Sequence, residues 1–202
     1  MALIGADRGA PIEDRAALAV FIGEEAEAFA RGAVDGYTRA RVRGDADAVM
    51  ARPELAAAVT IACGEALPLA FILVAQMVES ALAAKARDRA AQLDAVVAVA
   101  QAAFDRRPRP PAMTIAAWAA GRAELLRWLG EAASYPPKAT NAIVDAFAGP
   151  MLALMPIHDA LGRDDYPLLR NAMRTALAAV HARFAARAVA PLLAQSLVRR
   201  DG

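Results

Sequence analysis

The chain has 202 residues, a length that suits one compact domain better than two. Its 23 Lys and Arg residues against 22 Asp and Glu give a formal net charge of +1, so no bulk field attracts nucleic acid or an anionic membrane. The single cysteine, Cys63, excludes an intramolecular disulfide framework and suits a reducing compartment. We therefore expect a cytoplasmic protein without a nucleic-acid partner.

Helix-forming residues dominate the sequence. It is 58% hydrophobic but only 5% aromatic, because alanine fills the space between Leu, Val, Glu, Arg and Gln. Alanine is the strongest helix former, since it loses no side-chain entropy. Larger apolar residues recur three, four or seven positions apart, whereas the two-residue alternation of a strand is nowhere sustained. The sequence predicts an all-α fold, a single-domain helical bundle of about six to eight helices.

The first helix is predicted from Pro11 to about Gly44. Proline suits the first helical position because its missing N–H is not needed there, and the acidic residues that follow favour the positive end of the helix dipole. Gly32 and Gly36 lie four residues apart on this helix. Close approach of a neighbouring helix would offset their cost of about 1 kcal/mol each; the alternative is that both glycines lie on a solvated side.

The most apolar stretch of the sequence is Leu55–Val78. A membrane-spanning helix needs about 20 predominantly apolar residues, and Glu65 and Pro68 interrupt this stretch near its middle. We therefore predict a buried core helix and no transmembrane segment. Proline removes an N–H and clashes with the preceding turn, so we expect helices at 53–67 and 68–84, either separate or joined as one rod kinked at Pro68.

Prolines and helix caps divide the second half of the chain. Residues 107–111 cannot be helical, because successive prolines fix φ and force the residues before them into extended conformations. Residues 151–157 are predicted to be irregular, since Pro150 and Pro156 bracket them. The helices expected here are a stretch that ends near Asp105, Thr114–Ser134, Thr140–Ala148, and a last helix that Asp165 caps and that kinks or ends at Pro191.

One helical domain is expected to span most of the chain. We predict a flexible N-terminus at residues 1–10, a helical domain at 11–198 and a C-terminal tail at 199–202. The first segment lacks the apolar stretch of a secretory signal. There is no repeat of fixed period and no Gly/Ser linker between two cores. The proline-rich turn at 107–111 is interpreted as a loop within the bundle, because the helices on both sides have apolar stripes that need cover.

No motif in the sequence is typical of a catalytic or metal site. Di-iron bundles use Glu-x-x-His, which is missing, and neither His158 nor His181 has a ligand partner three or four residues away. Gly-x-Ser-x-Gly, Gly-x-Gly-x-x-Gly and the Walker lysine are also missing. Cys63 lies in the most apolar stretch, where burial makes a thiol inert. We expect neither a metal nor a cofactor.

The most concentrated polar segment is His158–Tyr166. Loops of this kind, before the start of a helix, can carry function. His158 would act as an acid or base near pH 7, Asp159 or Asp164 would set its tautomer, and Arg163 would bind an anion. The alternative is an ordinary turn, in which Asp164 caps the next helix and His158 bonds to the main chain.

A second group of candidate residues comes from the predicted helices. Glu65 is the lone charge of the apolar stretch, so if its face is buried it must be paired, protonated or lining a pocket. His181 lies at the edge of an apolar stripe. Each is either a structural group whose hydrogen bonds are made within the protein or a ligand-binding residue. Together with Trp118 and Trp128, they are the candidates to orient a small apolar ligand in a cavity between helices.

Four segments give the sequence a recognisable layout. They are the turn Met155-Pro156-Ile157-His158, the arginine-containing turn after it, the helix from Asn171 to Phe184, and the run from Phe21 to Tyr37 with Phe29 and Gly36. The layout resembles a poorly characterised group of helical proteins of similar length from alphaproteobacteria, some labelled esterases. The resemblance covers most of the chain and implies a helical layout. It transfers no site and no reaction, because the serine elbow expected of an esterase is missing.

The sequence is compatible with three functions. The first is a non-enzymatic interaction or accessory protein that acts through helix faces as a homodimer, since the small-residue helix face and Leu55–Val78 leave apolar surface to cover. The second is a binder of a small apolar ligand in a cavity between helices. The third is an esterase-like hydrolase that uses His158 and a nearby carboxylate.

Overall fold

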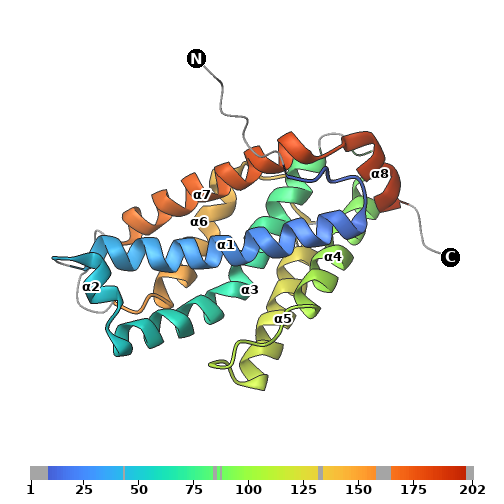
Figure 1. Ribbon diagram of the computed structural model, residues 1–202. Coiled ribbons are helices and arrows are strands. Elements are labelled where there is room, and N and C mark those ends of the chain that lie inside the picture. Colours follow the sequence, from blue (N-terminus) through green and yellow to red (C-terminus); the bar gives the residue numbers. More distant parts are fainter. Residues whose placement is uncertain are drawn as a thin grey trace, which may run out of the picture.

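The computed structural model describes residues 9–42, 44–83, 86, 88–131, 134–157 and 165–198. These residues form eight helices and no named strand (Figure 1). The helices are α1 (Arg15–Arg41), α2 (Ala46–Met50), α3 (Pro53–Ala83), α4 (Arg89–Asp105), α5 (Ile115–Glu131), α6 (Thr140–Ala153), α7 (Asp165–Arg187) and α8 (Ala190–Val198). The all-α bundle of six to eight helices that the sequence predicts is confirmed.

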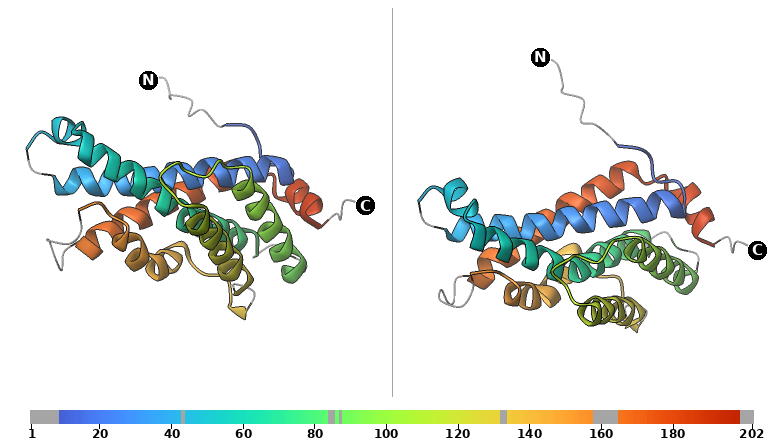
Figure 2. Two further views of the ribbon diagram at one scale, coloured as in Figure 1. Left: turned by 90° about the horizontal axis from the view of Figure 1, so that it is seen from below. Right: turned by 60° about the horizontal axis from the view of Figure 1, so that its bottom comes forward.

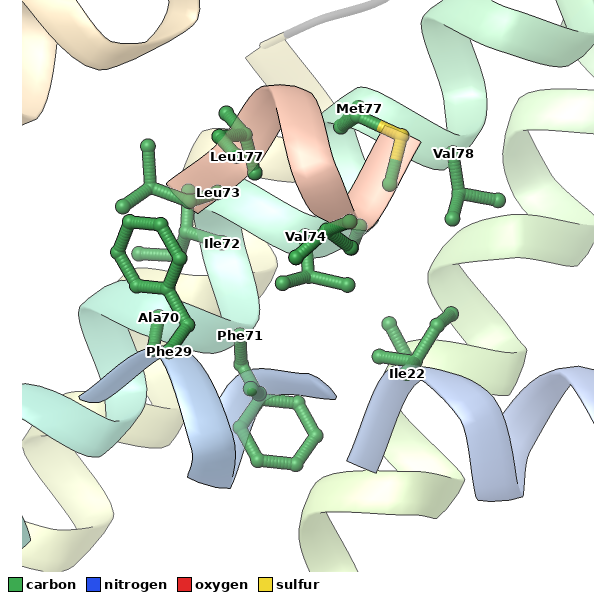
Figure 3. Close-up of a cluster of buried hydrophobic side chains, with 14 of the residues drawn as sticks. Ile22, Phe29, Ala70, Phe71, Ile72, Leu73, Val74, Met77, Val78 and Leu177 are labelled. Carbon is green, nitrogen blue, oxygen red and sulfur yellow. The ribbon is translucent and has the colours of Figure 1, made fainter. Parts of the chain in front are cut away.

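The second half of α3 forms the centre of the bundle. Residues 66–79 are all buried except the half-buried Leu69, and α3 packs against α1, α4, α5, α6 and α7. Figure 3 shows Ile22 and Phe29 of α1 and Leu177 of α7 gathered around this half of α3. The other helices are therefore arranged as a cover over one apolar rod.

Pro68 lies inside α3, which continues through it as one helix of 31 residues. Figures 1 and 2 show that the helix changes direction near its middle, as expected of an internal proline. The proline ring packs against Gly121 of α5, where an added Cβ would lie 2.6 Å from Pro68 Cγ. Of the two arrangements that the sequence left open, the structure has the single kinked rod.

The first half of α3 is much less covered than the second. Ala57, Ile61 and Glu65 are exposed, with Ile61 at 42%. Only Val59, Ala62 and Gly64 are buried in this half, so the predicted buried core helix has one buried side here and is buried on nearly all sides from residue 66 onward. By length and composition α3 is also apolar enough to cross a membrane. Within its most apolar 18-residue segment, 61% of the residues are buried inside the protein. Core helices of soluble proteins have the same property.

Helix α1 begins four residues later than predicted. Asp14 caps it, since its carboxylate accepts a hydrogen bond of 2.8 Å from the backbone N–H of Ala17. Pro11 therefore lies outside the helix. At the other end α1 stops at Arg41, close to the predicted stop at Gly44, whose φ of +85° favours glycine.

The glycines of α1 do not behave as expected. Gly32 and Gly36 are exposed, and a Cβ at either would meet nothing within 4 Å. The prediction that a neighbouring helix packs against them is wrong; they lie on the solvated side. The buried glycine of α1 is Gly23, which makes room for the side chain of Arg107. That side chain also pairs with Glu27 at 2.8 Å.

Two further differences from the prediction concern α2 and α6. The five-residue helix α2 was not expected; Asp45 caps it by accepting hydrogen bonds from the N–H groups of Asp47 and Ala48. Helix α6 was predicted to end at Ala148 but continues to Ala153 through Pro150. Residues 151–153 are thus helical, and the buried Met151 side chain extends the apolar stripe of α6.

Hydrogen bonds join the start of the described chain to its end. Ile12 donates a backbone hydrogen bond to Arg187 (2.9 Å) and accepts one from Val189 (3.1 Å), and Arg15 donates to the carbonyls of residues 196 and 197 at the end of α8. Helix α7 ends at Arg187 and α8 begins at Ala190. Pro191 lies in the first turn of α8, where its missing backbone N–H is not needed for a helical hydrogen bond. Residues 1–8 and 199–202 lie outside the described residues.

The contact between Pro68 and Gly121 predicts a specific mutational effect. Gly121→Ala should lower the free energy of unfolding by about 1–3 kcal/mol, because the new Cβ would overlap a rigid proline ring. The matched control is Gly130→Ala on the same helix, where a Cβ meets nothing within 4 Å and better helix propensity adds up to about 1 kcal/mol. Urea denaturation measures both. Equal effects at the two positions would contradict this contact.

Candidate functional site

The sequence-predicted acid–base residues cannot be placed. His158, Asp159, Arg163 and Asp164 all lie outside the described residues. The hydrolase site that they would form, and the ordinary turn that is its alternative, both remain predictions.

Both tryptophans are engaged in packing between helices. The ring of Trp118 stacks on Phe104 of α4, with centroids 4.2 Å apart. Trp128 donates its indole N–H to Glu124 at 2.6 Å and meets Phe147 of α6 edge to face at 4.8 Å. These contacts hold α5 between α4 and α6.

The other two candidate residues point to solvent. Glu65 and His181 are exposed, so neither needs a buried partner. His181 lies on the solvent-exposed side of α7, whereas the two tryptophans lie on α5 and contact Phe104 of α4 and Phe147 of α6. The structure does not bring Glu65, His181 and the two tryptophans together around one cavity.

A buried polar cluster joins α3 to α4 and to the chain before α6. The Glu79 side chain is only 3% exposed and pairs with Arg89 Nε at 3.0 Å. Ser80 Oγ donates to Glu79 at 3.4 Å and accepts a hydrogen bond from the backbone N–H of Lys138 at 3.3 Å. We call Gln76, Glu79, Ser80 and Arg89 the α3–α4 polar cluster.

The interior of the α3–α4 polar cluster is small. Gln76 Oε1 is buried and makes no hydrogen bond to other described residues. The space beside Gln76, Glu79 and Arg89 measures about 10 Å³, which is the size of one water molecule. The cluster therefore connects helices and offers no room for an organic ligand.

A second buried cluster joins the end of α1 to the start of α7. Asp165 is 1% exposed, and Arg41 Nη2 lies 2.6 Å from its carboxylate. Burial raises the pKa of the neighbouring Tyr37 to about 12, and the Asp165 carboxylate acts in the same direction. The phenol is thus protonated at neutral pH and the carboxylate is paired, so neither group is an available base.

Sequence reasoning missed most of these buried polar groups. Gln76, Glu79 and Ser80 follow i, i+3, i+4 spacing at the end of the apolar stretch, and this shared helix face was the available signal. Asp165 was expected only as a helix cap. It is the first residue of α7, but its pairing with Arg41 depends on how two distant helices meet.

The surface of the described part of the molecule has shallow depressions. A groove of about 420 Å³ lies between α4 and α8, with Asp88, Asp94 and Leu197 on its walls. Another, of about 200 Å³, lies beside Cys63. Among the described residues, no three His, Cys, Asp or Glu side chains are grouped so that they could hold a metal ion.

Helix α5 presents an apolar face to solvent. Of its 17 residues only Leu125 and Leu129 are buried, and Ile115 is 77% exposed. The uncharged exposed residues of this helix are Ile115, Ala116, Ala117, Ala119, Ala120, Ala123 and Gly130; we call them the α5 face. The right-hand view of Figure 2 shows α5 at the lower margin of the bundle.

Comparison with known proteins does not identify this chain: no family model, curated protein or solved structure matches it. A function for this chain is therefore inferred from the geometry of its described residues alone.

Removing Glu79 should reveal how strongly the α3–α4 polar cluster holds the bundle. Glu79→Ala removes a buried carboxylate that pairs with Arg89 and accepts a hydrogen bond from Ser80, and we expect the free energy of unfolding to fall by about 2 kcal/mol. Glu131→Ala breaks an ion pair between half-exposed side chains on α5 and should cost less than about 1 kcal/mol. Urea denaturation compares the two. A cost at Glu79 no larger than that at Glu131 would show that the cluster adds little.

Cys63 should be a slow nucleophile. Burial raises the pKa of its thiol to about 11, with Asp35 acting in the same direction, so the thiolate is scarce at pH 8. We expect alkylation by iodoacetamide at pH 8 to be about a hundredfold slower in the folded protein than in the chain unfolded by urea. The folded rate should rise with pH up to about 11. Equal folded and unfolded rates at pH 8 would contradict the raised pKa.

Proposed function

We propose that this protein is a non-enzymatic interaction protein that acts through its helix faces as a homodimer. The observation that carries the proposal is the exposure of large apolar side chains on several helices. Ile115 is 77% exposed, and Ile61 and Leu192 are each more than 40% exposed. Apolar surface of this kind, when it forms a patch, is typical of a protein interface.

The charge of the chain supports a second copy as the partner. With a formal net charge of +1, two copies repel each other only weakly. Several arginines on the bundle surface are already paired with carboxylates, such as Arg122 with Asp105 at 2.7 Å and Arg174 with Asp145 at 2.6 Å. The cytoplasmic location expected from the single cysteine is part of this proposal.

The two alternative functions have less support. A small apolar ligand would need a cavity between helices, and Trp118 and Trp128 are occupied by packing contacts. The hydrolase would rest on His158 and its neighbours, which lie outside the described residues. No observation among the described residues favours either one.

The mass of the purified protein tests the proposal. In sedimentation or light-scattering measurements without detergent, over about 1 to 200 μM, we expect the weight-average mass to rise from that of one chain towards twice that value. The rise should persist at high salt, because apolar contacts are not screened. A mass that stays at one chain across the whole range would refute the homodimer.

A further inference from the structure

The chain between α4 and α5 is a proline-rich loop on the surface of the bundle (Figure 1). It contains Pro108, Pro110 and Pro111. We infer that residues 107–111 form a short polyproline II segment that binds an aromatic-lined groove of another protein. This inference does not rest on the homodimer, because the segment lies outside the helices and its partner is a different protein.

The prolines favour an extended backbone over this segment. Each proline restricts its own φ to about −65° and disfavours the helical region for the residue before it. Arg107, Arg109 and Pro110 all precede a proline, so all three favour extended conformations. The extended stretch ends after Pro111, where the backbone N–H of Met113 donates a hydrogen bond of 2.9 Å to the carbonyl of Pro110.

Burial along the segment follows the period of a polyproline II helix. Arg107 and Pro110, three residues apart, are half-buried, whereas residues 108, 109 and 111 are exposed. A polyproline II helix has three residues per turn, so one of its edges faces the bundle and the other two face solvent. Pro108 and Pro111 therefore lie on the same exposed edge, one turn apart.

Contacts with the bundle hold the inward edge in place. The Arg107 side chain lies against Gly23 and pairs with Glu27 of α1 at 2.8 Å. The Pro110 ring packs against Gly64 of α3, where an added Cβ would lie 3.0 Å from Pro110 Cβ. The segment is thus ordered before a partner binds, which lowers the entropy cost of binding.

The exposed side chains indicate what a partner must offer. Two prolines one polyproline II turn apart fit the aromatic-lined grooves with which SH3 and WW domains bind proline-rich segments. Arg106 and Arg109 are exposed beside the prolines, although one nitrogen of Arg109 donates to the carbonyl of Met113. Since arginine pairs well with carboxylates, the partner that fits is an aromatic groove with an acidic residue at its edge.

A second copy of this chain offers no such groove among its described residues. The exposed aromatic side chains there are Tyr135 and Tyr166. Lys138 lies over the ring of Tyr135, and Arg170 lies over that of Tyr166. Both tryptophans pack between helices. The partner is therefore a different protein.

Binding of purified proline-reading domains to the whole chain tests the inference. We expect at least one domain from a panel of SH3 and WW domains to bind with a Kd below about 500 μM. By NMR of the isotope-labelled chain, it should shift the amide signals of the non-proline residues at 106–113. Pro108→Ala and Pro111→Ala should each weaken this binding about tenfold, as loss of a central contact does.

The matched control is Pro137→Ala, which alters an exposed proline of another loop and should leave the binding unchanged. Far-UV circular dichroism checks that the variants fold. The inference is overturned if no domain of the panel binds with a Kd below about 500 μM, or if a bound domain leaves the signals at 106–113 in place. It also fails if Pro137→Ala weakens binding as much as Pro108→Ala does. None of these results bears on the homodimer, which the mass measurement tests separately.

Discussion

The burial of residues 66–79 of α3 is the constraint on which the rest of the bundle depends. This segment has no polar side chain before Gln76, and the helix to which it belongs is in contact with α1, α4, α5, α6 and α7. Each covering helix uses its own apolar stripe to remove this rod from water, which is the dominant favourable term in folding. A helix at the margin of the bundle then has one side packed against other helices and another side exposed to solvent. Helix α5 is the clearest case.

Apolar faces rich in alanine do not fix the position of one helix along its neighbour, because many positions bury similar surface. In this bundle polar contacts at the helix ends fix that position. Glu79 and Arg89 join the end of α3 to the start of α4, and Arg41 and Asp165 join the end of α1 to the start of α7. Breaking a buried pair is costly because a charge is left without its partner. The two clusters thus fix how these helix ends meet.

The fold class was predictable because alanine content and helical spacing are local properties of the chain. Packing partners were not. Gly32 and Gly36 looked like contact points but face solvent, whereas Gly121 meets Pro68 and Gly23 meets Arg107, pairs more than 50 residues apart. The candidate site was less predictable still: Trp118 and Trp128 fill gaps between helices, and the buried ion pairs depend on helices meeting in three dimensions.

Hydrogen exchange of the purified protein in aqueous buffer without detergent tests most directly whether α3 is the protein-covered core of a helical bundle. The account predicts that backbone amides of residues 66–79 exchange most slowly of all, and that amides of residues 54–61 on the same helix exchange much faster, because solvent reaches that half. Slow exchange over the whole of α3 only when detergent or lipid is present, or equally fast exchange in both halves, would contradict it.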